Sequence, residues 1–272
     1  MPSYLVTGAG RGLGYGLLKN LASNPDNIVF GLVRNAQAAR DRLAVDGITN
    51  VHVVQVTSIT DSTSLSQAAQ EVETIVGDSG LDCLINNAAY VSEVTAYTSL
   101  SDVPSKESSD LFVEDLYKSF DVNVIGVLKT TFAFLPLIQK GKLKKVVAIS
   151  SGMADIDLIN EVKIPFSAPY AVSKAALSAL VAKFHAAYAD TGILFISLCP
   201  GLVDTAQREL SQKELQGIQE MAKLFAEYAP DFKGAFTADE SAYNVLEAIS
   251  RSSLKGGHGG TFLSHNGTRR WM

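Results

Sequence analysis

The sequence is poor in the residues that mark secreted, metal-binding and membrane proteins. It has two cysteines and four histidines among 272 residues. Cys83 and Cys199 lie in apolar runs typical of buried strands, so we expect free thiols and a reducing compartment, the cytoplasm. The histidines do not stand at metal-ligand spacings, which predicts no metal. No apolar run approaches ~18 residues, and a strand is expected close to Met1, so neither a membrane span nor a secretory leader is expected.

An excess of positive charge is also missing. Lysine and arginine number 23 against 28 aspartates and glutamates, which leaves a net charge of −5. Nucleic acids and anionic membranes favour a concentrated basic surface, so neither is an expected partner. Apolar residues are plentiful at 47%, a composition typical of a soluble globular protein with a large core.

Short apolar runs alternate with longer amphipathic ones along the chain. The predicted strands lie at residues 4–7, 28–33, 51–56, 81–85, 146–149, 193–198 and 261–263. Helical patterns fall within 111–137 and 170–188 and near 207–228 and 238–251. Strands that alternate with helices predict a parallel sheet covered on both faces. Because no linker or repeat interrupts the pattern, we predict one doubly wound, Rossmann-type α/β domain over residues 1–272, with a substrate loop at about 202–236.

Glycine is concentrated directly after the first predicted strand, in TGAGRGLGYG from Thr7 to Gly16. The spacing fits T-G-x-x-x-G-x-G through Thr7, Gly8, Gly12 and Gly14, whereas G-x-G-x-x-G fits in no register. In a doubly wound sheet this turn opens a helix whose N-terminus can bind phosphate. The turn therefore predicts a dinucleotide site.

Four more motifs follow in order: NNAA at 86–89, FDVNVIG around Asn123, SSG around Ser151, and YAVSK from Tyr170 to Lys174. A tyrosine and a lysine four residues apart share one helix face. Together with the glycine turn, these motifs resemble the short-chain dehydrogenase/reductase family over the whole chain, although Ala89 replaces that family's usual glycine. The ending GGTFLSHNGTRRWM is similar to C-factor-like carbonyl reductases and to fungal polyketide ketoreductases of secondary metabolism.

The resemblance implies roles for four catalytic residues. Tyr170 would exchange a proton with the substrate oxygen, and Ser151, rather than Ser150, would donate a hydrogen bond to it. Lys174 would hold the nicotinamide ribose, and Asn123 would join Lys174 in a water-linked proton relay. A cation about 4 Å from a phenol is also expected to lower its pKa, so Lys174 should activate Tyr170.

The expected cofactor is NADP(H). NAD-preferring members of the family carry an acidic residue at the end of the second strand, where this chain has Arg34. Arg11 in the glycine turn is a second candidate for the 2′-phosphate. The aspartate common after the third strand is replaced by Thr57 and Ser58. The expected cofactor contacts are Thr7, Gly8, Gly10, Arg11, Gly12, Leu13, Gly14, Arg34, Ser58, Asn87, Ala88, Tyr170, Lys174, Pro200, Gly201, Val203 and Thr205.

Two long segments, within 90–110 and 152–169, are expected at the pocket mouth. The predicted pocket lining is apolar (Met153, Ile156, Leu158, Leu202, Val203 and residues 225–236), which favours an apolar or aromatic carbonyl or alcohol substrate. The resemblance also implies a homodimer or homotetramer. Three functions stay open: a ketoreductase or alcohol dehydrogenase, another reaction such as imine reduction, epimerisation or assisted cyclisation, and a non-catalytic NADP-binding regulator.

Overall fold

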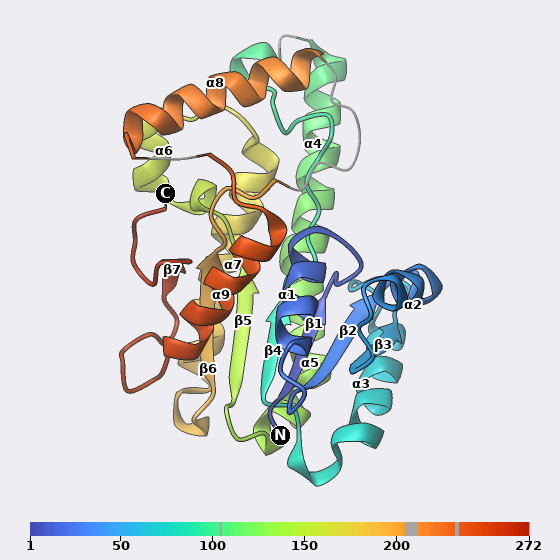
Figure 1. The fold of residues 1–272 in the computed structure, drawn as a ribbon. Helices are drawn as coiled ribbons and strands as arrows, with labels where there is room; N and C mark the ends of the chain where they lie inside the picture. Colours follow the sequence, from blue (N-terminus) through green and yellow to red (C-terminus); the bar gives the residue numbers. More distant parts are fainter. Residues whose placement is uncertain (104, 205–211, 232–233, 272) are drawn as a thin grey trace.

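The computed structural model describes residues 1–103, 105–204, 212–231 and 234–271, which form a single α/β domain (Figure 1). All seven predicted strands are present, and every pairing between them is parallel. Their order across the sheet is β3-β2-β1-β4-β5-β6-β7. The strands are β1 (Ser3–Thr7), β2 (Ile28–Val33), β3 (Val51–Gln55), β4 (Cys83–Asn86), β5 (Lys145–Ile149), β6 (Leu194–Cys199) and β7 (Phe262–Ser264). The predicted doubly wound Rossmann-type fold is therefore confirmed.

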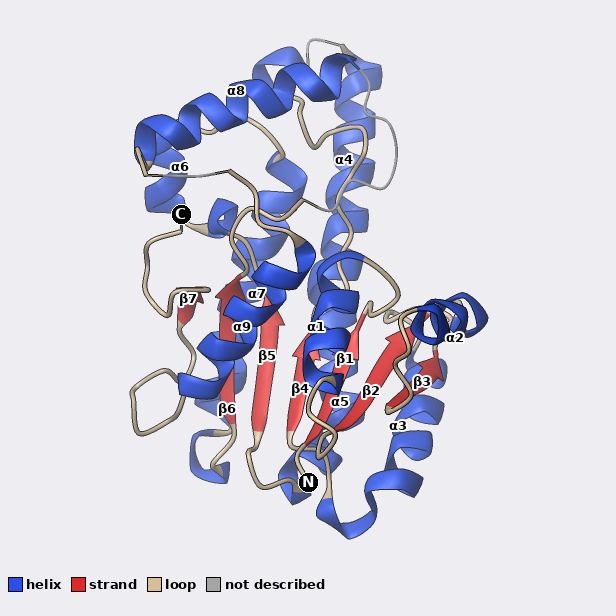
Figure 2. Cartoon of the chain, in the orientation of Figure 1, coloured by secondary structure: helices blue, strands red, loops and turns tan. Residues whose placement is uncertain are grey.

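Helices cover both faces of this sheet (Figure 2). One core cluster joins the sheet to α1 (Gly12–Ala22), α2 (Ala36–Val45) and α9 (Ala238–Arg251). The other joins the opposite face to α3 (Ser62–Val76), α5 (Val127–Lys140) and α7 (Ala168–Ala187). Strands buried on both faces are near-continuous apolar runs, which is why they stand out in the sequence.

Local capping sets where several helices begin. The Asp61 side chain accepts hydrogen bonds from the backbone N–H groups of Thr63 and Ser64 and so starts α3. Asn35 does the same for α2 through the N–H of Ala38. Both caps lie in the short connections that follow β2 and β3, so they fix where the chain turns from strand to helix.

A long helical run occupies the centre of the molecule: α4 (Lys106–Phe120), the π-helical segment η3 (Asp121–Gly126), and α5. Residues Glu107–Lys140 are long and apolar enough to cross a membrane, but over half of the most apolar stretch is buried inside the protein, as in a core helix. Its exposed apolar side chains belong mainly to α4 and include Leu111, Leu116, Tyr117 and Phe120.

The two long segments meet above the carboxyl ends of the strands. A bridge between Ser99 and Phe166 joins them, and α6 (Ile156–Val162) packs against α8 (Gln212–Tyr228) (Figure 1). Leu158 is buried in a cluster with Phe225, against which Met153 and Leu202 pack. Ile156 was also expected to line the pocket, but its side chain is 69% exposed because it lies on the solvent side of α6.

Candidate active site

The glycine turn is shaped by backbone contacts that leave no room for side chains at two positions. Gly8 has a φ of +65°, and a Cβ there would lie 2.8 Å from the Cα of Ala88. At Gly14 a Cβ would lie 2.3 Å from the Gly8 carbonyl oxygen and 2.5 Å from the Asn87 amide nitrogen. At Gly10 the nearest atom, a methyl carbon of Val33, would be 3.8 Å away, which is an ordinary van der Waals contact. Close packing therefore shapes this turn, here called the cradle, at Gly8 and Gly14, whereas Gly10 has room for a Cβ.

Thr7 fixes this cradle to the strand beside it. Its Oγ1 accepts hydrogen bonds from the N–H groups of Asn87 (3.0 Å) and Ala88 (2.9 Å). The Asn87 side-chain amide donates in return to the Thr7 carbonyl oxygen at 2.9 Å. The predicted contacts Thr7, Gly8, Gly14, Asn87 and Ala88 therefore form one connected unit.

The helix that follows, α1, begins without a cap. No side chain accepts a hydrogen bond from its first N–H groups, and its first turn contains no acidic residue. Arg11 and Arg34 are exposed beside it, and within the described ranges neither guanidinium has a hydrogen-bond or ion-pair partner. Free N–H groups at a helix N-terminus with unpaired arginines nearby form a good anion site.

The structure brings Ser151, Tyr170 and Lys174 together where β5 and β6 end. Ser151 caps the short turn η4 (Gly152–Ala154), and its side chain hydrogen-bonds to Tyr170. Lys174 is 2% exposed, and its Nζ donates to the Ile149 carbonyl at 2.7 Å. Ser150 instead faces α7, where its Oγ lies 3.3 Å from the Ser178 hydroxyl. The two neighbouring serines therefore have different surroundings, and the choice of Ser151 as the catalytic serine stays a prediction.

The expected effect of Lys174 on Tyr170 is not present in this structure. Burial is the main cause that raises the pKa of Tyr170, nearby Cys199 adds to it, and the hydrogen bond with Ser151 opposes it. Burial also lowers the pKa of Lys174 to about 7. The Lys174 Nζ lies 5.6 Å from the centre of the Tyr170 ring. Because Lys174 is itself desolvated and directed at a carbonyl, it does not offset the burial of the phenol.

Asn123 connects the cofactor side of the site to the catalytic helix. Its Oδ1 accepts from the Tyr90 N–H at 2.7 Å, and its Nδ2 donates to the Tyr90 carbonyl and the Ser173 hydroxyl, each at 2.9 Å. The Ser173 hydroxyl donates to the Tyr170 carbonyl at 2.7 Å. With its side-chain amide occupied in this way, a relay from Asn123 to Lys174 would have to use the main chain.

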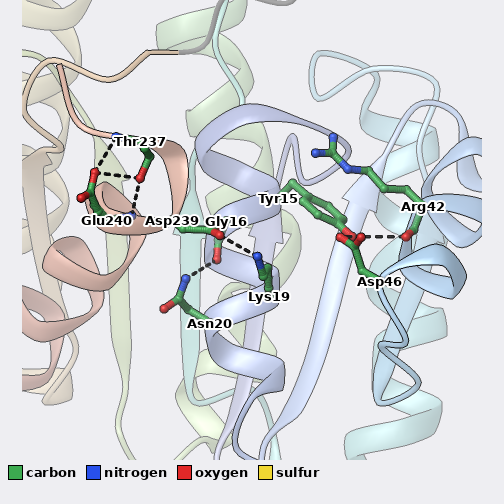
Figure 3. Close-up of polar contacts among 9 residues, drawn as sticks. All are labelled: Tyr15, Gly16, Lys19, Asn20, Arg42, Asp46, Thr237, Asp239 and Glu240. Atoms are coloured by element: carbon green, nitrogen blue, oxygen red, sulfur yellow. Dashed lines mark hydrogen bonds and ion pairs between the residues drawn. The ribbon is translucent and has the colours of Figure 1, made fainter.

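A cavity of about 290 Å³ runs along the outer side of α1. Its lining includes Gly12, Tyr15 and Arg42, and Ala238 and Asp239 at the start of α9. Figure 3 shows Tyr15, Arg42 and Asp239 among these residues. Sequence reasoning missed Tyr15 and Arg42. They lie 27 positions apart on different helices, and no motif connects them.

Comparison with known proteins agrees with this arrangement. Residues 3–216 match the family model described as short chain dehydrogenase. The short-chain dehydrogenase/reductase AacuF of Aspergillus aculeatus and the short chain dehydrogenase virK of Hypocrea virens are 44% and 40% identical to this chain, over the full length of both partners. The chain belongs to the short-chain dehydrogenase family. Among solved structures, the NADPH-bound carbonyl reductase from chicken fatty liver has a TM-score of 0.76, with 27% identity over 98% of each chain.

Membership confirms the resemblance and makes the protein an oxidoreductase of a family that binds a nicotinamide cofactor and acts on small molecules. The residues present fit a nicotinamide cofactor. The glycine turn carries no side chain where its backbone is packed most closely, and no side chain caps the N-terminus of the helix that follows it. The Ser58 hydroxyl lies 2.9 Å from the hydroxyl of Thr60 in a local turn. Because this hydroxyl is already paired, contacts with adenine at this position would come mainly from the backbone.

The predicted contacts after β6 lie at the same edge of the short-chain dehydrogenase sheet. Gly201 has a φ of +80° and packs on Phe236, the Pro200 carbonyl accepts from the Ser241 hydroxyl at 2.8 Å, and Val203 bridges to Phe236. Thr205 lies outside the described residues.

The C-terminal tail packs against the turn that follows Ser151, a contact that sequence reasoning did not foresee. Trp271 is 3% exposed and stacks on Phe262 with 4.3 Å between ring centroids. A Cβ on Gly152 would lie 3.0 Å from the Cβ of Trp271, so the tryptophan backs the turn that follows Ser151. In the sequence, the tryptophan of the closing motif was the one indication of this contact, and the motif does not tell which residues it packs against.

Proposed function

We propose that this oxidoreductase reduces a ketone or aldehyde to an alcohol, or catalyses the reverse, with NADP(H) as cofactor. The observation that carries the proposal is the continuous set of contacts from the glycine turn to the catalytic helix. Thr7 is hydrogen-bonded to Asn87, and the chain then continues three residues to Tyr90. Hydrogen bonds link the Tyr90 backbone through Asn123 and Ser173 to Tyr170. A nucleotide site and an acid–base site are thereby built as one rigid unit.

The preference for NADP(H) rests on charge. Arg11 and Arg34 are both exposed and without partners in the described part of the chain. Position 34 is not acidic, and the first turn of α1 holds no acidic residue that would repel a 2′-phosphate. Charge-assisted contacts from guanidinium groups contribute about 1.5–3 kcal/mol each. The NADPH-bound state of the chicken carbonyl reductase is consistent with this assignment.

In the proposed mechanism the cofactor, when bound, supplies or accepts the hydride. Burial raises the pKa of Tyr170, so its phenol keeps its proton at neutral pH and donates it to the carbonyl oxygen during reduction. Ser151 donates a hydrogen bond to the same oxygen as negative charge develops there. Lys174, held at the Ile149 carbonyl, would support the nicotinamide ribose.

We also propose the substrate class, assembly and location. The cluster of Leu158, Phe225 and Trp271, with Met153 and Leu202 against it, favours an apolar or aromatic carbonyl. A second copy of the chain would cover the exposed apolar side chains of α4, of which Tyr117 is 74% exposed, to give a homodimer or homotetramer. The cytoplasm suits the two buried free thiols.

Tyr170→Phe tests the function. It removes the transferable proton but leaves the cradle intact, so kcat on the best carbonyl of a substrate panel should fall by about 10²–10⁴-fold, while NADPH affinity changes less than about threefold. Nicotinamide absorbance measures the first and calorimetry the second. Tyr243→Phe, at an exposed position of α9 outside the proposed interface, is the matched control and should change neither. Near-full turnover by Tyr170→Phe would disprove the mechanism.

A further inference from the structure

Arg42 is a third arginine beside the glycine turn. It projects from α2, and its Nη1 lies 3.5 Å from the carbonyl oxygen of Gly10. The turn lies against the end of β2, because the Ala9 N–H donates to the Leu32 carbonyl at 3.3 Å and Gly10 faces Val33, the residue before Arg34. Arg42 thus contacts the turn that contains Arg11, and this turn packs against the strand that ends just before Arg34.

A tyrosine, and not a carboxylate, holds the Arg42 side chain. The guanidinium carbon lies 3.9 Å from the centre of the Tyr15 ring (Figure 3). Tyr15 is a fixed platform: it is buried, and its hydroxyl donates to Asp46 at 2.5 Å. Neither salt bridge among the described residues includes Arg42. A guanidinium stacked on a ring keeps its full charge and leaves its edge N–H groups free for an oxyanion.

We propose that Arg42 binds the 2′-phosphate of NADP(H) and that Tyr15 positions it there, an inference that rests on the dinucleotide site proposed above. The phosphate monoester carries up to two negative charges and three acceptor oxygens, which suits a guanidinium fork. Stacking on Tyr15 restricts the arginine before the ligand arrives, so less side-chain entropy is lost on binding. The site would then discriminate NADP(H) from NAD(H) with a residue outside the glycine turn and the strand end.

The direct test is calorimetric titration with 2′,5′-ADP and 5′-AMP, which differ only in the 2′-phosphate and need no substrate. Arg42→Ala should weaken 2′,5′-ADP binding by about 10-fold or more and change 5′-AMP binding less than about twofold. Arg40→Ala is the matched control, because Arg40 lies on the same helix and its nearest hydrogen-bond partner is the Val53 carbonyl. It should alter neither ligand.

Two variants of Tyr15 separate positioning from folding. Tyr15→Leu should lose part of the preference for 2′,5′-ADP, and Tyr15→Phe, which keeps the ring, should retain it. If the wild type prefers 2′,5′-ADP and Arg42→Ala keeps that preference unchanged, the role of Arg42 is overturned while the NADP(H) assignment stands. If the wild type shows no preference, the NADP(H) assignment itself fails and the role of Arg42 fails with it.

Discussion

The N-termini of α1 and α9 lie side by side along one cavity, but side chains cap only the N-terminus of α9. At α9 the Thr237 hydroxyl accepts from the Glu240 N–H, and the Glu240 carboxylate accepts from the Thr237 N–H at 2.9 Å. The first turn of α9 also holds Asp239, which pairs with Lys19 at 2.6 Å. At α1 there is neither a side-chain cap nor an acidic residue.

The difference shows how the fold assigns one of two similar helix ends to a ligand. Both ends carry the partial positive charge of a helix N-terminus. Side chains of α9 satisfy its free N–H groups and neutralise that charge, so α9 serves to pack against α1, where Gly16 allows the Ala238 carbonyl to approach closely. The N–H groups of α1 have no such partner, and the glycine turn shapes the space beyond them.

The largest effect on NADPH binding is expected from adding a side chain where the glycine turn is packed most closely. Gly14→Ala would place a Cβ 2.3 Å from the Gly8 carbonyl oxygen, so the turn must shift. Overpacking of this kind costs about 1–3 kcal/mol of folding free energy, and NADPH binding should weaken by at least about 10-fold. Urea unfolding and NADPH titration measure the two effects.

Gly10→Ala serves as the stability control for that variant, because its Cβ would have no atom closer than 3.8 Å. Its free energy of unfolding should match that of the wild type within about 0.5 kcal/mol. Equal stability and equal NADPH affinity for Gly14→Ala and Gly10→Ala would show that close backbone packing does not shape the site.

A smaller effect, on stability alone, is expected at α9. Thr237→Ala removes the hydroxyl that caps the helix and should lower the free energy of unfolding by about 1 kcal/mol, as for other N-caps. The affinity for NADPH should change less than about twofold, since this helix end is not offered to the ligand. A tenfold loss of NADPH affinity in this variant would mean that α9 shares in the anion site and that the comparison is wrong.

The sequence predicts the sheet and the glycine turn well, because both depend on local patterns. Each of the seven strands contains a short apolar run, and the order of motifs predicts that Ser151, Tyr170 and Lys174 lie near one another. The contacts it does not predict join distant segments. Arg42 stacks on Tyr15 across 27 residues, and Trp271 packs on Gly152 from the other end of the chain.

The electrostatic expectation for Tyr170 failed for a related reason. The four-residue spacing places Tyr170 and Lys174 on one helix face, but it says nothing of the Ile149 carbonyl that the lysine binds. Nor does it report how far burial lowers the pKa of Lys174. Both depend on how β5 packs against α7.

The most direct test of the open helix end is to introduce a negative charge beside it. A Cβ at Gly10 would meet no atom closer than 3.8 Å. Gly10→Asp and Gly10→Asn differ in one charge and hardly in shape. Calorimetric titration with NADPH should give an affinity at least about 10-fold weaker for Gly10→Asp than for Gly10→Asn, because a carboxylate there repels phosphate from α1. Equal affinities for the two variants would contradict the claim that this end of α1 is kept open for the phosphates of the cofactor.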